Sequence, residues 1–208
     1  MTIEYKMNKE KILELAKNLF WRFGIRSVTM NDIARELGMS KKTLYQNFED
    51  KEEIVCLCLQ NQIDEDISVH DSACDNSQNG VDELVQIMEY HTEMMKNFHP
   101  SLLFDMQKYY PRAWELFMNY KDVFCVESIV KNIEKGIKEG FFYDDLDPII
   151  IAKLRMEQVQ MVFNPRIFPP NKFDIVYVHQ QVSKQFIYSI LNPAGWQMHK
   201  DLSTNSEK

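Results

Sequence analysis

Apolar residues recur at helical spacing along most of the chain. The first stripe advances in steps of three residues and one residue, which places its members on one face of an α-helix. It consists of Ile12, Leu15, Ala16, Leu19, Phe20 and Phe23. Asn8 is a suitable N-cap for this helix, and Gly24 suits its C-terminal end. Strict alternation of apolar and polar residues, the pattern of a half-buried strand, is never sustained, so an all-α fold is predicted.

Caps and breakers divide the rest of the chain into further helices. Thr29 and Ser40 are good N-caps, and Gly38 separates the two short helices that they start. Asp147 followed by Pro148 marks another helix start, because proline is favoured in the first helical turn. About nine helices are therefore expected, over residues 8–23, 30–37, 41–47, 51–68, 81–97, 101–108, 111–139, 147–163 and 172–191.

Polar and proline-rich stretches mark the connections. The segment 70–80 is polar and turn-rich, and 164–170 contains three prolines, so both are predicted to be loops. The C-terminal residues are polar and are expected to fray. These breaks predict an N-terminal domain over 1–55, a larger helical domain over 56–192 and a C-terminal tail over 193–208.

The composition is that of a soluble globular protein, with 45% hydrophobic and 26% charged residues. No run of about 18 apolar residues is present, and the N-terminus lacks the apolar core of a secretory signal. The sequence therefore predicts a cytoplasmic protein that does not contact a membrane. The cysteines show no metal-ligand spacing and are expected to be buried, reduced thiols. They are Cys56, Cys58, Cys74 and Cys125.

The net charge of −7 would by itself argue against nucleic acid, because affinity for phosphates comes from cations. The charge is unevenly distributed, however. Residues 1–58 contain 10 lysines and arginines against 9 acids, a net of +1, whereas the other 150 residues contain 14 against 22, a net of −8. The acidity thus belongs to the C-terminal part, and the N-terminal part is free to present positive charge to DNA.

Residues 29–54 combine the features of a helix-turn-helix that reads DNA. The second helix of such a motif locks onto the first through one apolar face and exposes a polar face that is not acidic. Leu44 and Phe48 supply the lock, and the small side chain of Ala34 permits close approach of the two helices. Between Leu37 and Phe48 there are two lysines and no acid. Sequence-specific binding in the major groove of DNA is therefore predicted.

The same region resembles the N-terminal domain of the TetR/AcrR family of transcriptional regulators over about residues 8–55. The resemblance is carried by Thr29, Asp32-Ile33-Ala34, Gly38, Ser40, Thr43-Leu44-Tyr45, Phe48, Lys51-Glu52 and, in the first helix, Leu19-Phe20 with Phe23-Gly24. It implies a three-helix DNA-binding domain joined to a larger C-terminal helical bundle that binds a small-molecule inducer and forms a dimer. Beyond that region the chain resembles the family only in its helical character and its length.

The resemblance also implies roles for the polar residues of the motif. Base edges are expected to be read by Lys41, Lys42, Tyr45 and Gln46. Lysine can donate to guanine, and glutamine can pair with adenine. Phosphate contacts are expected from Thr29, Thr43, Asn47 and Lys51. Tyr45 suits either role, and the alternative for each lysine is a solvated surface charge.

The larger domain is expected to supply a dimer interface and a ligand pocket. One helix-turn-helix reads few base pairs, so specificity calls for a homodimer, with the last two long helices, 147–163 and 172–191, as its interface. The alternative is that these helices complete the core of one subunit. Aromatic and methionine side chains of the middle helices either fill the core or line a pocket for a small apolar or amphipathic ligand. The predicted pocket residues are Met94, Phe98, Phe104, Trp114, Phe117, Phe124 and Arg155. Arg155 is placed to anchor an anionic ligand or to pair across the dimer.

The predicted function is that of a transcriptional repressor, released from a palindromic operator by a small-molecule ligand. Two alternatives stay open: a constitutive or activating DNA-binding regulator without an inducer, and a helical protein-interaction module. An enzyme is not expected, because the five histidines have no ligand spacing and no phosphate-binding loop or nucleophile elbow is present. No catalytic residue, metal or cofactor is predicted.

Overall fold

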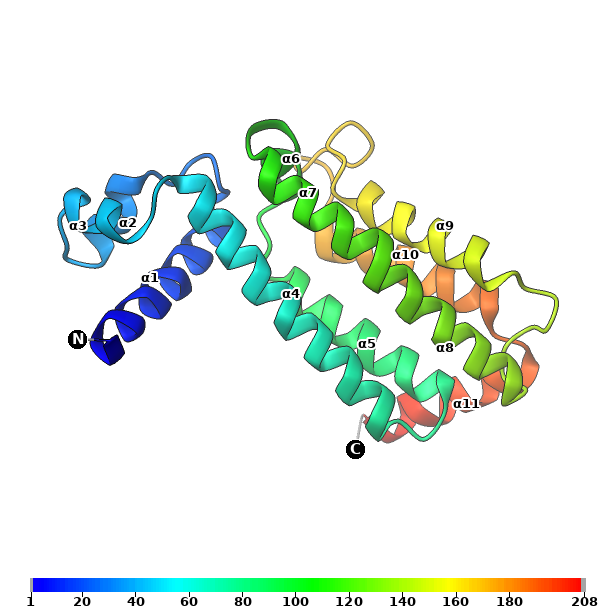
Figure 1. Cartoon of the computed structure of the whole chain (residues 1–208). Coiled ribbons are helices and arrows are strands. Elements are labelled where there is room, and N and C mark those ends of the chain that lie inside the picture. The colour runs from blue at the N-terminus through cyan, green and yellow to red at the C-terminus, as the bar shows by residue number, and fades with distance from the viewer. Residues whose placement is uncertain (1, 207–208) are drawn as a thin grey trace. The chain divides into compact units, whose positions relative to one another are not determined.

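A computed structural model describes the backbone of residues 2–206 and the side chains of residues 9–202. Within this part of the chain the fold is all-α, as predicted, with eleven α-helices, one π-helical segment and no strand (Figure 1). The elements are α1 (Thr2–Phe23), α2 (Met30–Glu36), α3 (Lys41–Asn47), α4 (Lys51–Asn76), α5 (Gly80–Met95), α6 (Leu102–Tyr109), α7 (Pro111–Asn119), η1 (Tyr120–Cys125), α8 (Val126–Lys138), α9 (Pro148–Val162), α10 (Ile175–Ile190) and α11 (Pro193–Ser206). None of the helices described is both long and apolar enough to cross a membrane.

The structure has more helices than the nine expected, and some are longer. The predicted helix 111–139 contains the π-helical segment η1, whose wider turns separate α7 from α8 without ending the helical run. Helix α4 continues to Asn76 through most of the expected 70–80 loop. There the Asn76 Nδ2 group donates to the Ser72 carbonyl at 2.8 Å, so this polar side chain bonds within the helix. Helix α1 begins at Thr2, so Asn8 lies inside it and does not start it.

Residues expected to fray at the C-terminus form helix α11 instead. Asn192 caps this helix, because its Oδ1 atom accepts from the N–H groups of Ala194 and Gly195 at 3.0 Å each. Trp196 packs on Tyr188 of α10, with ring centroids 4.5 Å apart. The cap and the aromatic contact therefore stabilise a helix that the polar composition of this segment does not predict.

The expectation of buried thiols is wrong for one cysteine. Cys58 is buried and Cys56 and Cys125 are half-buried, but Cys74 is exposed. Cys74 belongs to the last turns of α4, which the sequence pattern did not predict to be helical, and the helix turns this position toward solvent.

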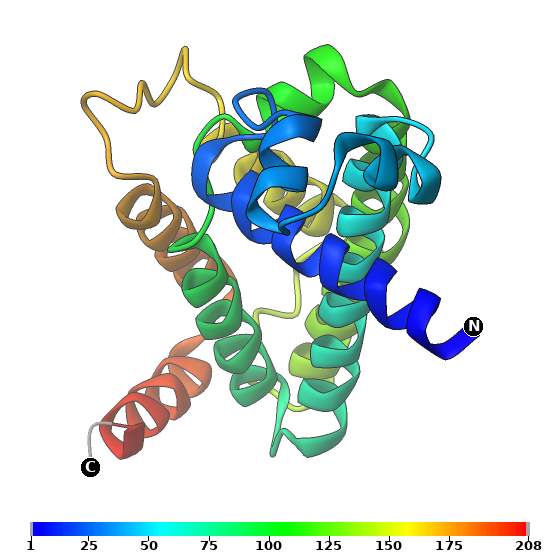
Figure 2. The same cartoon turned by 90° about the vertical axis from the view of Figure 1, so that its left-hand side faces the viewer.

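The chain divides into two compact units. The first comprises residues 1–65 and 97–118, and therefore α1 to α3, the first part of α4, α6 and most of α7. In Figures 1 and 2 the blue helices α1, α2 and α3 lie together as one cluster. The buried core of this cluster includes Ile12, Phe20, Ile33, Leu44 and Phe48. The later segment joins the same unit, because the His99 N–H donates to the Trp21 carbonyl at 2.7 Å.

The second unit comprises residues 66–96 and 119–208. In it α9 contacts α8 and α10, and α5 contacts α8, α10 and α11; Figure 1 labels these helices. One apolar core joins these helices and the turn that carries Phe142. Its buried members are Val81, Leu84, Ile133, Phe142, Phe186, Ile187, Ile190 and Leu191.

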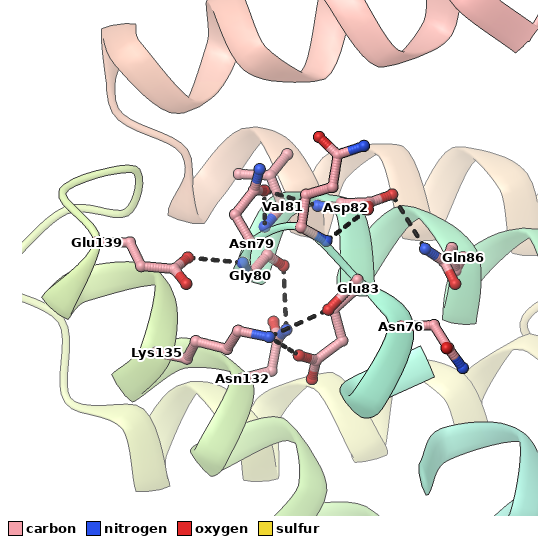
Figure 3. A network of polar contacts seen from close by, with 12 residues as sticks. Asn76, Asn79, Gly80, Val81, Asp82, Glu83, Gln86, Asn132, Lys135 and Glu139 are labelled. Atoms are coloured by element: carbon pink, nitrogen blue, oxygen red, sulfur yellow. Dashed lines mark hydrogen bonds and ion pairs between the residues drawn. The ribbon is translucent and has the colours of Figure 1, made fainter. Parts of the chain in front are cut away.

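A polar network fixes the start of α5 on α8 (Figure 3). The Gly80 N–H donates to Glu139 Oε2 at 2.6 Å, and the Gly80 carbonyl accepts from Asn132 Nδ2 at 3.0 Å. One turn away, Lys135 Nζ donates to Glu83 Oε2 at 2.7 Å. Because the first N–H groups of a helix lack partners within it, the bond from the Gly80 N–H to Glu139 stabilises the start of α5.

Gly136→Ala is expected to lower the free energy of unfolding by about 1–3 kcal/mol. A Cβ atom at Gly136 would lie 2.3 Å from the ring of Phe142, which is itself buried. This clash outweighs the gain of about 1 kcal/mol that alanine has over glycine in a helix. Urea unfolding followed by circular dichroism measures the effect. Glu134→Ala, at an exposed position of the same helix, is the control and should change stability by less than about 0.5 kcal/mol. A wild-type midpoint for Gly136→Ala would contradict the prediction.

Candidate functional site

Side-chain caps hold the helix-turn-helix formed by α2 and α3. Thr29 Oγ1 accepts from the Asp32 N–H at 3.1 Å, while Asp32 Oδ2 accepts from the Thr29 N–H at 2.9 Å and from the Thr29 hydroxyl at 2.6 Å. The hydrogen bond from that hydroxyl lowers the pKa of Asp32 below its usual value. Gly38 makes the turn with φ of +64°, a conformation that favours glycine. Ser40 Oγ then accepts from the Thr43 N–H at 3.0 Å and starts α3.

Apolar side chains lock α3 onto α2, as the sequence pattern predicts. Ile33 of α2 and Leu44 of α3 have no exposed surface, and Ala34 and Phe48 have almost none. These buried side chains and the caps leave α3 little freedom to rotate, so its other face has a fixed orientation within the first unit.

The outer face of α3 is exposed, and we call it the reading face. Its members are Lys41, Lys42, Tyr45 and Gln46, all of which are exposed. The Lys41 ammonium lies 5.7 Å from the centre of the Tyr45 ring. Among the side chains described, neither lysine of this face pairs with a carboxylate. Both cations are therefore available to a ligand of opposite charge, such as the backbone of DNA.

Two of the residues expected at phosphates are partly engaged inside α3. Thr43 and Asn47 are half-buried. Thr43 Oγ1 lies 2.8 Å from Ser40 Oγ, and Asn47 Nδ2 donates to the Thr43 carbonyl at 2.8 Å. Thr29 is exposed, but its hydroxyl donates a hydrogen bond to Asp32. Phosphate contacts by these residues would extend or replace local hydrogen bonds, and they stay predictions.

Lys51, the fourth expected phosphate contact, points into its own unit. Its Nζ atom donates to the Ile25 carbonyl and lies 5.6 and 5.4 Å from the ring centres of Phe20 and Tyr110. Burial lowers the pKa of Lys51 to about 8, against the opposing effect of nearby acids. A phosphate contact would require this side chain to leave its bond to Ile25, so Lys51 is the least exposed cation of the predicted set.

The predicted pocket residues belong to both compact units. Phe98, Phe104, Trp114 and Phe117 lie in the first unit, and Met94, Phe124 and Arg155 lie in the second. Phe104 is 41% exposed, with the Lys108 ammonium 5.5 Å from its ring centre. Trp114 and Phe117 pack on each other at 5.5 Å between centroids. The seven predicted residues therefore cannot all line a pocket that lies within one unit.

Arg155 is buried in the second unit, with 2% of its surface exposed. Its Nη2 group donates to Ser183 Oγ at 2.9 Å and to Met88 Sδ at 3.3 Å, and the guanidinium lies 5.1 Å from the centre of the Phe186 ring. Within the described part of the chain, no residue forms a hydrogen bond with the Nη1 group. Burial lowers the pKa of Arg155 to about 10, and no carboxylate among the side chains described counters this effect.

Three histidines accompany Arg155, and reasoning from the sequence missed them. His70 and His91 lie with ring centroids 5.4 Å apart. Burial lowers the pKa of His91 to about 3, with smaller effects from His70, His179 and Arg155. Burial, and then the charge of Arg155, lowers the pKa of His179 to about 4. We call these four residues the buried polar cluster; His70, Arg155 and His179 are buried, and His91 is half-buried. They come from α4, α5, α9 and α10, so no spacing along the chain could have indicated their proximity.

The capped helix-turn-helix with an exposed, acid-free second helix defines a DNA-binding transcriptional regulator. Residues 12–56 match the family model described as bacterial regulatory proteins, tetR family. An HTH-type transcriptional regulator of Staphylococcus aureus strain MRSA252 is 30% identical over 132 residues, which are 60% of this chain and 71% of that protein. The chain belongs to the TetR family of transcriptional regulators.

Solved structures agree with the fold over nearly the whole chain. A TetR-family regulator from Agrobacterium tumefaciens superposes with a TM-score of 0.76 at 16% identity, covering 90% of this chain and 100% of that one. A transcriptional regulator from Saccharomonospora viridis, solved in complex with choline, gives 0.69 at 18% identity, covering 90% and 99%. The likeness therefore extends beyond the helix-turn-helix into the second unit.

Proposed function

We propose that this DNA-binding regulator is a repressor that holds a palindromic operator as a homodimer and is released by a small molecule. The observation that carries the DNA-binding part is the reading face of α3, which is exposed, free of acids and fixed by the caps of α2 and α3. Lys41, Lys42, Tyr45 and Gln46 then read base edges in the major groove. Thr29, Thr43, Asn47 and Lys51 set the position of the motif on the phosphates.

The proposed dimer forms through α9 and α10. Large apolar side chains of both helices face solvent in the single chain, among them Ile149, Ile150 and Leu154 on α9 and Tyr177 and Tyr188 on α10. Ile150 and Leu154 lie one turn apart on α9, and α9 is in contact with α10, so these exposed apolar side chains favour a protein interface. A second copy of the chain is the occupant that suits a regulator of palindromic sites, since a two-fold dimer matches a two-fold operator.

The proposed inducer is a small apolar or amphipathic molecule bound in the second unit. Support comes from the aromatic and methionine side chains of that unit, and from the choline complex of the Saccharomonospora viridis regulator, whose fold is similar. The inducer releases DNA if it binds more tightly to a conformer whose two reading helices have a different spacing. A regulator with this mechanism works where DNA is, in the cytoplasm, and has no need of catalysis.

Binding to duplex DNA, selected by the full-length protein from a random-sequence pool, tests the proposed function. Six lysines of the dimer, Lys41, Lys42 and Lys51 of each subunit, should make the affinity fall roughly 1,000-fold between 50 and 200 mM salt. Fluorescence anisotropy with the selected duplex measures this slope, and a scrambled duplex of equal length is the control. The selected sites should be palindromic. A flat salt response, or no enrichment of any sequence, would favour the protein-interaction module instead.

A further inference from the structure

We propose that the inducer carries a carboxylate, which the buried polar cluster binds through Arg155 and His179. This inference rests on the proposed ligand response and adds the chemical class of the ligand. The two groups assigned to the carboxylate are Arg155 Nη1 and His179 Nδ1, which are both buried and have no hydrogen-bond partner among the residues that the structure describes. The two side chains are 2% and 1% exposed, so water reaches neither freely.

The environment of Arg155 favours the binding of an anion. A buried guanidinium is stable when it is paired, and the partners of Arg155 are a hydroxyl, a thioether and an aromatic ring. Lys121 is another strongly buried cation of the described part of this unit, and its Nζ atom has the Glu157 carboxylate at 2.8 Å and the Asp122 carboxylate at 3.4 Å. The same fold thus supplies acids to one buried cation and withholds them from the other.

A single negative charge fits the cluster best. Burial lowers the pKa of all three histidines, His70, His91 and His179, and keeps them neutral at neutral pH, so Arg155 is the one positive charge of the cluster. A carboxylate balances that charge, whereas the dianion of a phosphate monoester would leave an uncompensated negative charge in a buried site. Met88 and Phe186 beside the guanidinium are apolar, which suits a ligand whose remainder is apolar. A quaternary ammonium ion such as choline would meet the positive Arg155 and is disfavoured.

Burial also decides between the two roles expected for Arg155. The side chain is enclosed by Met88, Ser183 and Phe186 of its own subunit. It is therefore not placed to pair with a charge on a second subunit, and the anion must enter the helical unit itself.

The test uses thermal unfolding of the full-length protein with hexanoate, decanoate and phenylacetate, each compared with its primary amide. At 100 times Kd, a carboxylate that binds should raise Tm by about 5–10 °C, and its amide should not. Arg155→Met should lower the affinity for that carboxylate by about 30-fold or more. His179→Phe should weaken it as well, while His179→Asn, which keeps a donor near the position of Nδ1, should retain part of the affinity. Lys121→Met is the matched control for removal of a buried cation, and it should leave the carboxylate response intact.

Stability without ligand separates recognition from a structural role. Arg155→Met removes a buried unpaired charge and should keep or raise Tm, whereas Lys121→Met breaks an ion pair and should lower it. A large fall in Tm for Arg155→Met would mean that Arg155 holds the fold. Equal effects of acids and amides, no effect of any carboxylate, or a preference for hexyl phosphate would each overturn the carboxylate assignment. Operator binding is measured on the same samples to distinguish the two proposals. If the wild-type protein did not bind the operator, the proposed function would be refuted, whatever the result with carboxylates.

Discussion

Replacement of both Lys41 and Lys42 by glutamate is expected to abolish operator binding by the full-length protein. Both lysines are exposed on the reading face, and neither supports the fold through an ion pair among the side chains described. Each lost contact to a base or phosphate is worth about 1–3 kcal/mol, and a dimer loses four of them. Carboxylates placed near DNA phosphates add repulsion. Affinity for the selected duplex should therefore fall by about 1,000-fold or more.

The control for this variant carries the same change in net charge on the second unit. Lys138→Glu with Lys172→Glu alters two exposed lysines outside the helix-turn-helix and should change operator affinity by less than about tenfold, through long-range charge alone. Both double variants should unfold at the wild-type temperature, because all four positions are on the surface. Retained operator binding in the Lys41 and Lys42 variant would show that another surface of the protein reads DNA.

The helix-turn-helix could be predicted in detail because its determinants are local. Thr29 and Asp32 form a capping box that spans four residues, and the cap of α3, from Ser40 to Thr43, also spans four residues. Gly38 makes the turn between them. Burial of Leu44 and exposure of Lys41 and Lys42 then follow from helical spacing alone. A short motif whose bonds span three or four residues is visible in the sequence.

The buried polar cluster could not be predicted, because its members meet only through tertiary packing. Between 21 and 64 residues separate each of His70, His91, Arg155 and His179 from the next along the chain. The sequence shows that Arg155 is a charge in a largely apolar helix. That it has no acidic partner among the described side chains is a property of the packed unit. The histidines looked unrelated because helical periodicity reports which face a residue occupies and not what that face meets.

Local pattern also fails where a helix continues without an apolar stripe. The last turns of α4 and most of α11 are polar, and both were expected to be irregular. In α11 the order comes from Asn192 and from the contact of Trp196 with Tyr188. The segment η1 was missed for a different reason, since a π-helical turn shifts the face of later residues but leaves the composition helical.

Ile150→Asp combined with Leu154→Asp is expected to convert the proposed dimer into a monomer. These two side chains of α9 are 57% and 56% exposed in the single chain and lie one turn apart on one face. Burying two carboxylates at a symmetric interface places four charges in an apolar contact, which should weaken dimerisation by about 1,000-fold or more. Because the operator is read as two half-sites, the monomer should lose at least about 100-fold in affinity for the full duplex.

Sedimentation velocity gives the oligomeric state, and anisotropy with the selected duplex gives the affinity. Val123→Asp is the matched control, since Val123 is an equally exposed apolar residue of η1, outside α9 and α10. The control should stay dimeric and bind the operator as the wild type does. The α9 variant should still bind a single half-site with the same weak affinity as a wild-type subunit, because its reading face is unchanged. If that variant remained a dimer, the apolar surface of α9 would need another partner, and the interface would have to lie elsewhere on the chain.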